Sequence, residues 1–279
     1  MMRLAFSTLG CPRWELEEVA RAARVYGYAG VELRALGGGL DLLARPEFAP
    51  GAVEATRRRL EAQGLSVCCV DTSCVFHDRG AEERRRQVET AVRHCELAAA
   101  LGSPLIRVFP DKIQTGATRE ETRGFVAESL RAAAERAPAG VSVGLETHGD
   151  FAAAHEAVEI ARLADHPSVR VIWDVANSLA AGSAVEEAAR AVAPYLAHVH
   201  LRDARPVEGR EHWLPVLAGR GLVPFGAAFA ALRANGYGGF VSFEWEKFWN
   251  PEIEEPEVAL PDFARAAGRL LEGDARAGA

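Results

Sequence analysis

The chain has 279 residues, of which 49% are hydrophobic and 25% charged, and its formal net charge is −7. This composition is close to the average of soluble globular proteins, which argues against a disordered, collagen-like or coiled-coil chain. The acidic balance, without runs of Lys or Arg, argues against nucleic acid as the main partner. The composition therefore favours a globular protein that does not have nucleic acid as its main partner.

The sequence shows neither an evident targeting signal nor a cysteine pattern that predicts disulfide bonds. No apolar stretch approaches the ~20 residues that a membrane-spanning helix needs, and the run from Leu4 to Leu9 is too short for the core of a signal peptide. The five cysteines are odd in number and form no C-x-x-C pair, so we expect reduced thiols. We therefore predict a cytoplasmic protein without a membrane partner.

Short β-rich runs alternate with helical patterns from end to end. We predict eight strands, at Arg3–Thr8, Gly30–Arg34, Ser66–Ser73, Leu105–Phe109, Val141–Thr147, Val169–Val175, Ala197–Arg202 and Phe240–Trp245. Between them, apolar residues recur at three-and-four spacing, as in Leu16, Val19, Ala20 and Ala23, which is typical of amphipathic helices. Glycines mark the expected helix ends and prolines the expected starts. These are Gly27, Gly64, Gly102, Gly140 and Gly236, and Pro50, Pro224 and Pro261.

Eight units in 279 residues give about 35 residues each, a natural size for a strand, a helix and two loops. The units follow one another without a Pro/Gly/Ser-rich linker. This pattern predicts an α/β fold in which residues 1–279 form a single (β/α)8 TIM barrel. An open, doubly wound sheet is the alternative, but no G-x-G-x-x-G motif follows the first strand to support it.

The strand residues that face the barrel interior can be read from the alternation of apolar and polar side chains. On the fifth strand the apolar residues would face the helices, which leaves Glu146 and His148 inside. The same alternation turns Asp174, His200 and Glu244 inward on the following three strands. Each lies near the carboxyl end of its strand, the face on which TIM barrels build their active sites. The sequence therefore predicts that an inward Glu, Asp, His and Glu converge.

Three carboxylates cannot all stay ionised in a barrel interior without a counter-charge, because burial and mutual repulsion would raise their pKa values. A divalent cation supplies that charge. Hard oxygen donors with one imidazole suit Mn²⁺, Mg²⁺ or Co²⁺, and Zn²⁺ is also compatible. The alternative interpretation is that these side chains only form ion pairs with the inward Arg107 or Arg202. We favour the metal because four such groups are expected at one depth on successive strands.

Four segments carry a family resemblance, and they coincide with these strand ends: Leu145–His148, Trp173–Asn177, His198–Asp203 and Phe243–Glu246. They resemble the metal-ligand strand ends of the xylose isomerase-like barrel superfamily, and most of all its sugar phosphate isomerase/epimerase group. That group contains ketose 3-epimerases, inosose isomerases and dehydratases, and hydroxypyruvate isomerases. Gly30–Leu33 and Gly219–Phe225 also fit, so the resemblance covers nearly the whole chain.

The resemblance implies that Glu146, Asp174, His200 and Glu244 are the ligands of one divalent metal ion. One position departs from the family pattern. Many relatives carry a His three residues after the aspartate, and here that position is Asn177. An asparagine can hydrogen-bond a substrate hydroxyl, but it cannot act as an acid or a base.

The chemistry implied by the resemblance is proton transfer next to a carbonyl group. The ion would polarise the carbonyl of a small sugar-like substrate and stabilise the enediolate formed when a carbon-bound proton leaves. Glu146 and Glu244 could reach opposite faces of the enediolate, so that one removes the proton and the other returns it, which inverts the carbon centre. Return of the proton to the neighbouring carbon would give isomerisation, and loss of a hydroxyl would give dehydration.

Three further residues are candidates for substrate contact. His148, two residues beyond Glu146, could hydrogen-bond a substrate oxygen or lie on the rim. Arg205 could bind a hydroxyl, carboxylate or phosphate, or it could pair with Asp203. Trp14 could form a wall for the sugar ring, or pack against a helix.

Two expectations concern structural residues of the interior. Glu32 and Arg107 both face inward and are expected to form a structural ion pair. His198 lies one layer deeper than His200 and is expected to be a core histidine whose hydrogen bonds are satisfied. The long connection from Asp203 to Pro224 is expected to be a loop over the barrel mouth.

The leading hypothesis is a metal-dependent isomerase or epimerase of a small sugar, ketose, inosose or related hydroxy-carbonyl compound. An inosose dehydratase is the nearest alternative. An endonuclease IV-like metal phosphodiesterase is a third, although Asn177, Phe109 and the acidic balance count against it. A non-catalytic sugar-binding barrel is the fourth, and it predicts stabilisation by ligand without turnover. A homo-oligomer is compatible with each of these hypotheses.

Overall fold

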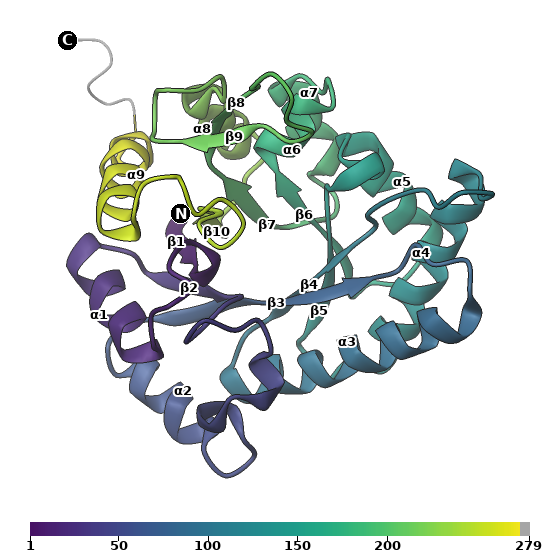
Figure 1. Cartoon of the computed structure of the whole chain (residues 1–279), viewed down its shortest axis with the longest axis horizontal. Coiled ribbons are helices and arrows are strands. Elements are labelled where there is room, and N and C mark those ends of the chain that lie inside the picture. The colour runs from purple at the N-terminus through teal and green to yellow at the C-terminus, as the bar shows by residue number, and fades with distance from the viewer. Residues whose placement is uncertain (274–279) are drawn as a thin grey trace.

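A closed barrel of parallel strands organises the molecule. The computed structural model describes residues 1–273, and within them eight strands form the barrel (Figure 1). In spatial order they are β1 (Arg3–Ser7), β10 (Phe240–Phe243), β7 (Leu196–Leu201), β6 (Val169–Asp174), β5 (Ser142–Glu146), β4 (Leu105–Phe109), β3 (Ser66–Val75) and β2 (Gly30–Leu33). The strand β2 pairs with β1 and closes the ring. The predicted single-domain (β/α)8 TIM barrel is therefore confirmed.

Helices connect successive strands and surround the barrel (Figure 1). They are α1 (Leu16–Tyr26), α2 (Val53–Glu61), α3 (Ala81–Leu101), α4 (Arg119–Ala134), α5 (Ala154–Ala164), α6 (Val175–Ala180), α7 (Val185–Val192), α8 (Phe225–Ala234) and α9 (Pro256–Leu271). Gly27 and Gly102 end α1 and α3 in the left-handed conformation, with φ of 80° and 72°, as their positions predicted.

Differences from the sequence prediction lie at the ends of elements. Only the range Leu105–Phe109 is reproduced at both ends; β3 runs two residues further than predicted, and β10 ends two residues earlier. Pro261 does not start a helix but lies inside α9, where it removes the N–H that would bond to the carbonyl of Glu257. The connection over the mouth is not only a loop, because β8 (Asp203–Arg205) and β9 (Leu214–Val216) form an antiparallel hairpin in it.

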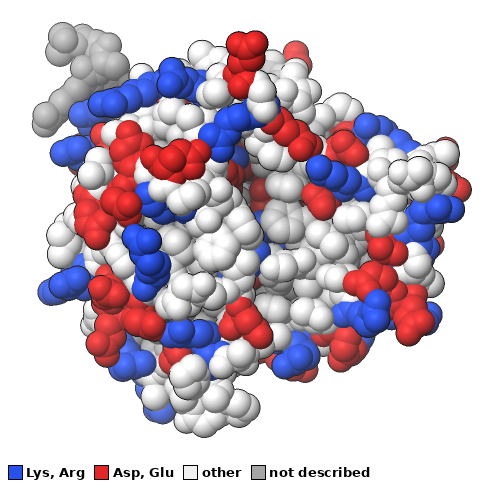
Figure 2. All heavy atoms as spheres, in the orientation of Figure 1, with Lys and Arg blue, Asp and Glu red and all other residues white. Residues whose placement is uncertain are grey.

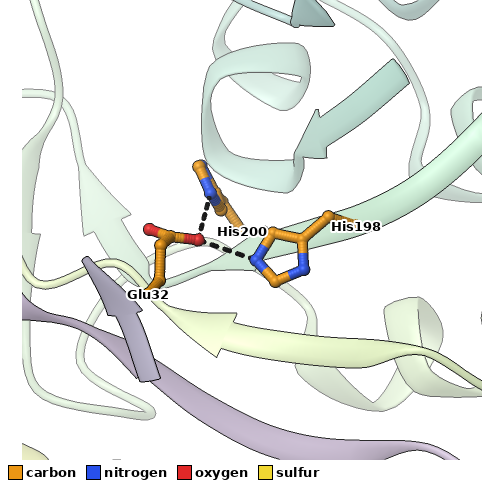
Figure 3. Close-up of side chains that lie close together, drawn as sticks. All are labelled: Glu32, His198 and His200. Carbon is orange, nitrogen blue, oxygen red and sulfur yellow. Dashed lines mark hydrogen bonds and ion pairs between the residues drawn. The ribbon is translucent and has the colours of Figure 1, made fainter. Parts of the chain in front are cut away.

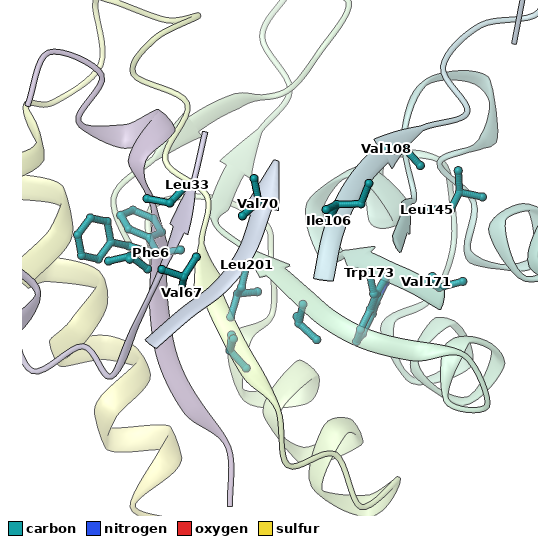
Figure 4. Packing of buried hydrophobic residues seen from close by; sticks show 14 of the residues in the cluster. Phe6, Leu33, Val67, Val70, Ile106, Val108, Leu145, Val171, Trp173 and Leu201 are labelled. Atoms are coloured by element: carbon teal, nitrogen blue, oxygen red, sulfur yellow. The ribbon is translucent and has the colours of Figure 1, made fainter. Parts of the chain in front are cut away.

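The main core lies between the strands and the helices. Alternate strand residues such as Phe6, Leu33, Val108 and Trp173 point outward and are fully buried against helices (Figure 4). At about 25 cal/mol for each Å² of apolar surface removed from water, this layer supplies most of the driving force for closing the barrel. The opposite set of strand residues fills the barrel interior.

The lower part of the interior is apolar. Cys69, Leu105 and Ile172 form a small cluster in which each side chain is almost completely buried. Gly144 leaves room for this cluster, because a Cβ atom at that position would lie 2.8 Å from the Ile172 side chain. The cluster closes the floor beneath the charged residues, which lie towards the carboxyl ends of the strands.

The outer surface carries charges of both signs. On the face drawn in Figure 2, basic and acidic side chains are interspersed rather than segregated by sign. All five cysteines are buried, and none of them forms a disulfide within residues 1–273. The described helices include none that is both long and apolar enough to cross a membrane.

Candidate metal centre

The four side chains predicted to bind a metal lie together at the carboxyl end of the barrel. Glu146 ends β5, Asp174 ends β6, His200 lies in β7, and Glu244 directly follows β10. Strand register sets their common depth, because Asp174 pairs with His200 and His200 pairs with Ser242, two residues before Glu244. One potential ligand atom from each lies within 4.8 Å of those of the others, and all four residues are buried.

His200 presents one ring nitrogen to this group. Its Nε2 lies 2.9 Å from Glu32 Oε2, which fixes the ring (Figure 3). Its Nδ1 lies 3.6 Å from Glu146 Oε2 and 3.4 Å from Glu244 Oε2, and it has no hydrogen-bond partner in the described part of the chain. A buried imidazole nitrogen without a partner, facing two carboxylates, is a suitable donor for a divalent cation.

Glu32 corrects one of the sequence expectations. Instead of pairing with Arg107, its Oε2 contacts both His200 and His198, the latter at 2.7 Å (Figure 3). Burial alone would raise the pKa of Glu32, but the two histidines outweigh burial and lower the pKa well below its usual value. The expected role of His198 as a buried histidine with a satisfied hydrogen bond agrees with this contact. Glu32 therefore orients the candidate ligand His200.

Arg107 pairs with other carboxylates. Its guanidinium lies 3.0 Å from Glu146 and 3.3 Å from Asp71. Burial alone would raise the pKa of Glu146, but Arg107 and His200 overcome burial and lower it. For Asp71 burial dominates over Arg107, and the pKa is raised well above its usual value. Arg107 therefore keeps Glu146 ionised and available as a ligand or base.

Arg202 balances the opposite side of the group. Its Nη1 pairs with Asp174 and lies 3.1 Å from Glu244, and its Nη2 lies 2.9 Å from Glu246. Burial raises the pKa of Asp174 even with Arg202 beside it, and burial likewise raises the pKa of Glu246 to about 7. One guanidinium is therefore shared by three carboxylates, which leaves an excess of negative charge. Together with the free Nδ1 of His200, this excess fits the residues to a divalent metal ion.

A cavity of about 600 Å³ opens above the group. Glu146 and Glu244 lie in its wall, and His148 and Asn177 line it as well. The Asn177 side chain accepts a hydrogen bond from Arg202 Nη2 at 3.1 Å and donates one to the Thr147 carbonyl at 3.3 Å. Its amide is thus held in place at the cavity wall.

His148 is oriented by the loop after β4. Its Nδ1 lies 3.3 Å from Asp111, and its ring packs on Phe109 with the ring centroids 4.6 Å apart. Burial alone would lower the pKa of His148, but Asp111 and Glu146 raise it. Asp111 adopts a φ of 53°, and its carbonyl accepts a hydrogen bond from the Asp150 N–H. These contacts hold the two loops together beside the cavity, and they present to it an imidazole whose protonated form is favoured by Asp111 and Glu146.

Two of the predicted substrate contacts lie elsewhere. Trp14 is partly buried and lines a separate hollow together with Cys11 and Lys247. Arg205 is exposed on β8 and is not among the residues that line the large cavity. Asp203 does not pair with Arg205 in the described chain; its carboxylate accepts hydrogen bonds from the N–H groups of Gly221 and Val223. The structure does not bring Trp14 or Arg205 to the candidate site.

Sequence reasoning missed several residues of the cavity wall. Arg34 follows β2, and the alternation that turns Glu32 inward also turns Arg34 inward, so this residue could have been found. Trp213 and Trp249 line the cavity from connections outside the barrel strands. Strand periodicity says nothing about such positions.

The comparisons with known proteins agree with this architecture. Residues 20–265 match the family described as xylose isomerase-like TIM barrel. The chain belongs to this family. The sequence matches none of the curated proteins with which it was compared.

Solved structures share the fold of this xylose isomerase-like barrel at low sequence identity. A probable 3-DHS dehydratase, AsbF of Bacillus anthracis, is 16% identical with a TM-score of 0.78, over 96% of this chain and 99% of that one. The IOLI protein, solved with a bound zinc atom, is 18% identical with a TM-score of 0.77, over 97% and 96%. The D-psicose 3-epimerase of Clostridium cellulolyticum H10 is 18% identical with a TM-score of 0.76, over 97% and 98%.

Proposed function

We propose that this barrel is a divalent-metal-dependent isomerase or epimerase of a small hydroxy-carbonyl compound such as a ketose or inosose. The observation that carries the proposal is the cluster of Glu146, Asp174, Glu244 and the unpartnered Nδ1 of His200, buried at the base of a cavity. The chain belongs to the xylose isomerase-like family and shares its fold with a D-psicose 3-epimerase, which supports sugar chemistry.

The four residues would hold one ion, and its identity is a further part of the proposal. Three carboxylates favour Mn²⁺, Mg²⁺ or Co²⁺, and the zinc of the IOLI structure makes Zn²⁺ the fourth candidate. When bound, such an ion polarises a carbonyl group and stabilises the negative charge that develops on its oxygen. We expect one ion per chain.

Proton transfer would fall to the two glutamates. Arg107 keeps Glu146 ionised, and Glu146 would take the proton from the carbon next to the carbonyl. The electron pair of the broken C–H bond forms the C=C bond of an enediolate. Glu244, in its protonated form, would then give a proton to the opposite face of the same carbon. Exchange with water would return both carboxyl groups to their starting states.

The pair His148 and Asp111 favours dehydration as a second candidate. A cationic imidazole at the cavity wall could protonate a leaving hydroxyl group and so convert the enediolate to an unsaturated ketone with loss of water. The probable 3-DHS dehydratase AsbF shares this fold, which supports the alternative.

Three further expectations stay predictions. They are the absence of a nucleic-acid partner, the cytoplasmic location and the formation of a homo-oligomer.

Hydrogen exchange tests the proposed proton transfer whatever the final product is. The full chain, loaded with Mn²⁺ and then exchanged into Mg²⁺ for spectroscopy, would be incubated in D₂O with ketoses and inososes, both neutral ones and ones that carry a carboxylate or phosphate group. We expect NMR to show deuterium replacing the hydrogen next to the carbonyl of at least one of them. Unsaturated products would identify dehydration instead. The absence of exchange from every ketose and inosose, with metal bound, would contradict both candidates.

A further inference from the structure

Arg34 lies at the cavity wall, and a hydrogen bond holds its backbone in place. It directly follows β2, and its N–H donates to Thr8 Oγ1 at 2.8 Å. The residue is only 4% exposed, and it lines the same cavity as Glu146 and Glu244. Arg34 is therefore a buried part of the candidate site rather than an exposed surface residue.

The partners of Arg34 do not neutralise its charge. Its Nη2 donates to Ser73 Oγ at 2.9 Å, whereas the buried Nη1 has no hydrogen-bond partner among residues 1–273. None of the carboxylates in that range comes within 4.0 Å of the guanidinium. The other arginines of the cavity wall differ in this respect, because Arg107, Arg202 and Arg210 each pair with at least one carboxylate.

Burial of a cation without an anion is costly, so the arrangement implies a ligand. Burial, followed by the nearby Arg107, lowers the pKa of Arg34 to about 10, which still leaves Arg34 charged at neutral pH. This lowering of the pKa is opposed by more distant carboxylates, those of Asp71, Glu244 and Glu146. Arg107 and Arg202 in the same wall also have guanidinium nitrogens without a hydrogen-bond partner, but both of these residues pair with carboxylates. Arg34 forms no such pair in the described chain, and a ligand oxyanion in the cavity would supply a partner for its Nη1.

We propose that Arg34 binds a carboxylate or phosphate group of the substrate, so that the site takes anionic rather than neutral hydroxy-carbonyl compounds. This inference rests on the proposed function, which assigns the hydroxy-carbonyl group at the other end of the substrate. The oxyanion accepts a charge-assisted hydrogen bond from Nη1, an interaction that a neutral hydroxyl group matches only weakly.

The barrel topology supports a fixed orientation of such a substrate. In the ring of strands, β2 lies opposite β6, with three strands between them on either side. Arg34 thus lies across the barrel from Asp174, which belongs to the acidic group. The excess negative charge of that group repels an anion, and Arg34 attracts it. The oxyanion therefore lies on the β2 side, with the hydroxy-carbonyl end towards Glu146 and Glu244.

Three compounds with one carbon skeleton test the proposal: D-fructose, D-fructuronate and D-fructose 6-phosphate. They present a hydroxyl, a carboxylate and a phosphate group at the same carbon. Binding to the full chain would be measured by calorimetry, with Mn²⁺ present and again after EDTA treatment. We expect at least one of the two anions to bind about 10- to 100-fold more tightly than D-fructose. The comparison of the two anions shows which oxyanion the site prefers.

Variants assign the preference to Arg34. Arg34→Met should remove the 10- to 100-fold difference, Arg34→Lys should keep part of it, and Arg58→Met on the exposed side of α2 should keep all of it. Thermal unfolding would show that Arg34→Met folds, with a Tm no lower than that of the unchanged protein, because it removes an unpaired buried charge.

The outcomes separate this inference from the proposed function. Arg34-dependent binding of an anion without hydrogen exchange would support the oxyanion site and contradict the isomerase. Exchange on D-fructose, with equal affinity for all three compounds, would support the isomerase and overturn the oxyanion site. Failure of both anions to bind at millimolar concentration, or equal binding by Arg34→Met, would also overturn it.

Discussion

The two halves of the barrel interior differ in how their charges are balanced. On the side of β6, β7 and β10, one guanidinium, that of Arg202, pairs with the carboxylates of Asp174, Glu244 and Glu246, and His200 Nδ1 lies 3.4 Å from Glu244. On the side of β2, Arg34 has no carboxylate within ion-pair distance in the described chain. One half therefore has excess negative charge and the other has an unpaired positive charge. The difference is the basis of the two proposals, a cation bound on one side and an anionic group bound on the other.

Arg107 lies between these regions, and carboxylates of the protein balance its charge. It comes from β4, and its partners Asp71 and Glu146 come from the strands on either side. Both carboxylates belong to the protein, so the charge of Arg107 is paired within the described chain, although its Nε and Nη2 have no hydrogen-bond partner there. We expect its role to be structural and electrostatic, in contrast to the ligand-dependent role of Arg34.

The largest expected effect is loss of proton transfer on the acidic side. Glu146→Gln keeps the shape of the side chain but removes the base, so hydrogen exchange should slow by about 10²- to 10⁴-fold. NMR in D₂O measures this rate. The matched control is Glu128→Gln on the exposed face of α4, which should exchange at the original rate. Unchanged exchange by Glu146→Gln would remove this residue from the mechanism.

The next largest effect is on the free energy of unfolding, where we expect Arg107→Met and Arg34→Met to differ. Arg107→Met leaves Asp71 and Glu146 buried without their cation, and we expect a loss of about 3–5 kcal/mol in the free energy of unfolding. Arg34→Met leaves no carboxylate without an ion-pair partner, so the loss in the free energy of unfolding should be near zero. Urea unfolding of both variants checks the contrast. Equal losses would show that the charges of the two arginines are balanced alike.

A smaller effect is expected at the floor that supports both halves. Gly144→Ala places a methyl group 2.8 Å from the Ile172 side chain, so the neighbouring side chains must move. Overpacking of this kind costs about 1–3 kcal/mol. Gly124→Ala, at a helical position with open space around it, is the control and should not destabilise the protein. A neutral Gly144→Ala would show that the floor is loosely packed.

The smallest effect concerns Asp111 and His148, and it depends on pH. The pKa of Asp111 is lowered, first by its close contact with His148 Nδ1, and the pKa of His148 is raised. The stabilisation is therefore lost when the pH falls through the lowered pKa of Asp111, and also when it rises through the raised pKa of His148. Asp111→Asn should cost about 0.5–1 kcal/mol near pH 5–6 and less above pH 8, as measured by urea unfolding. A cost that grows above pH 8 would contradict the pairing.

Much of the fold was predictable because strand alternation and helix periodicity agree along the whole chain. Strand alternation predicts the inward direction of the four candidate ligands, and strand register places them at one depth. The four are Glu146, Asp174, His200 and Glu244. Pairing inside the barrel was harder to predict, because inward side chains of several strands can reach one another. Glu32 was assigned to Arg107 for that reason and in fact contacts two histidines.

Positions outside the strands account for the remaining differences. Trp14 and Arg205 follow strands in the sequence, but the connections that carry them place them outside the cavity. The hairpin of β8 and β9 was not predicted, since its two strands have only three residues each. Such short elements carry too little periodicity to be recognised.

Anomalous diffraction from crystals of the full chain grown with Mn²⁺ is the most direct test of the central claim. The account predicts one anomalous peak per chain, bounded by Glu146, Asp174, Glu244 and the Nδ1 of His200. Absence of a peak there, or a peak only at the neighbouring group of Glu32, Cys69 and Asp71, would contradict it.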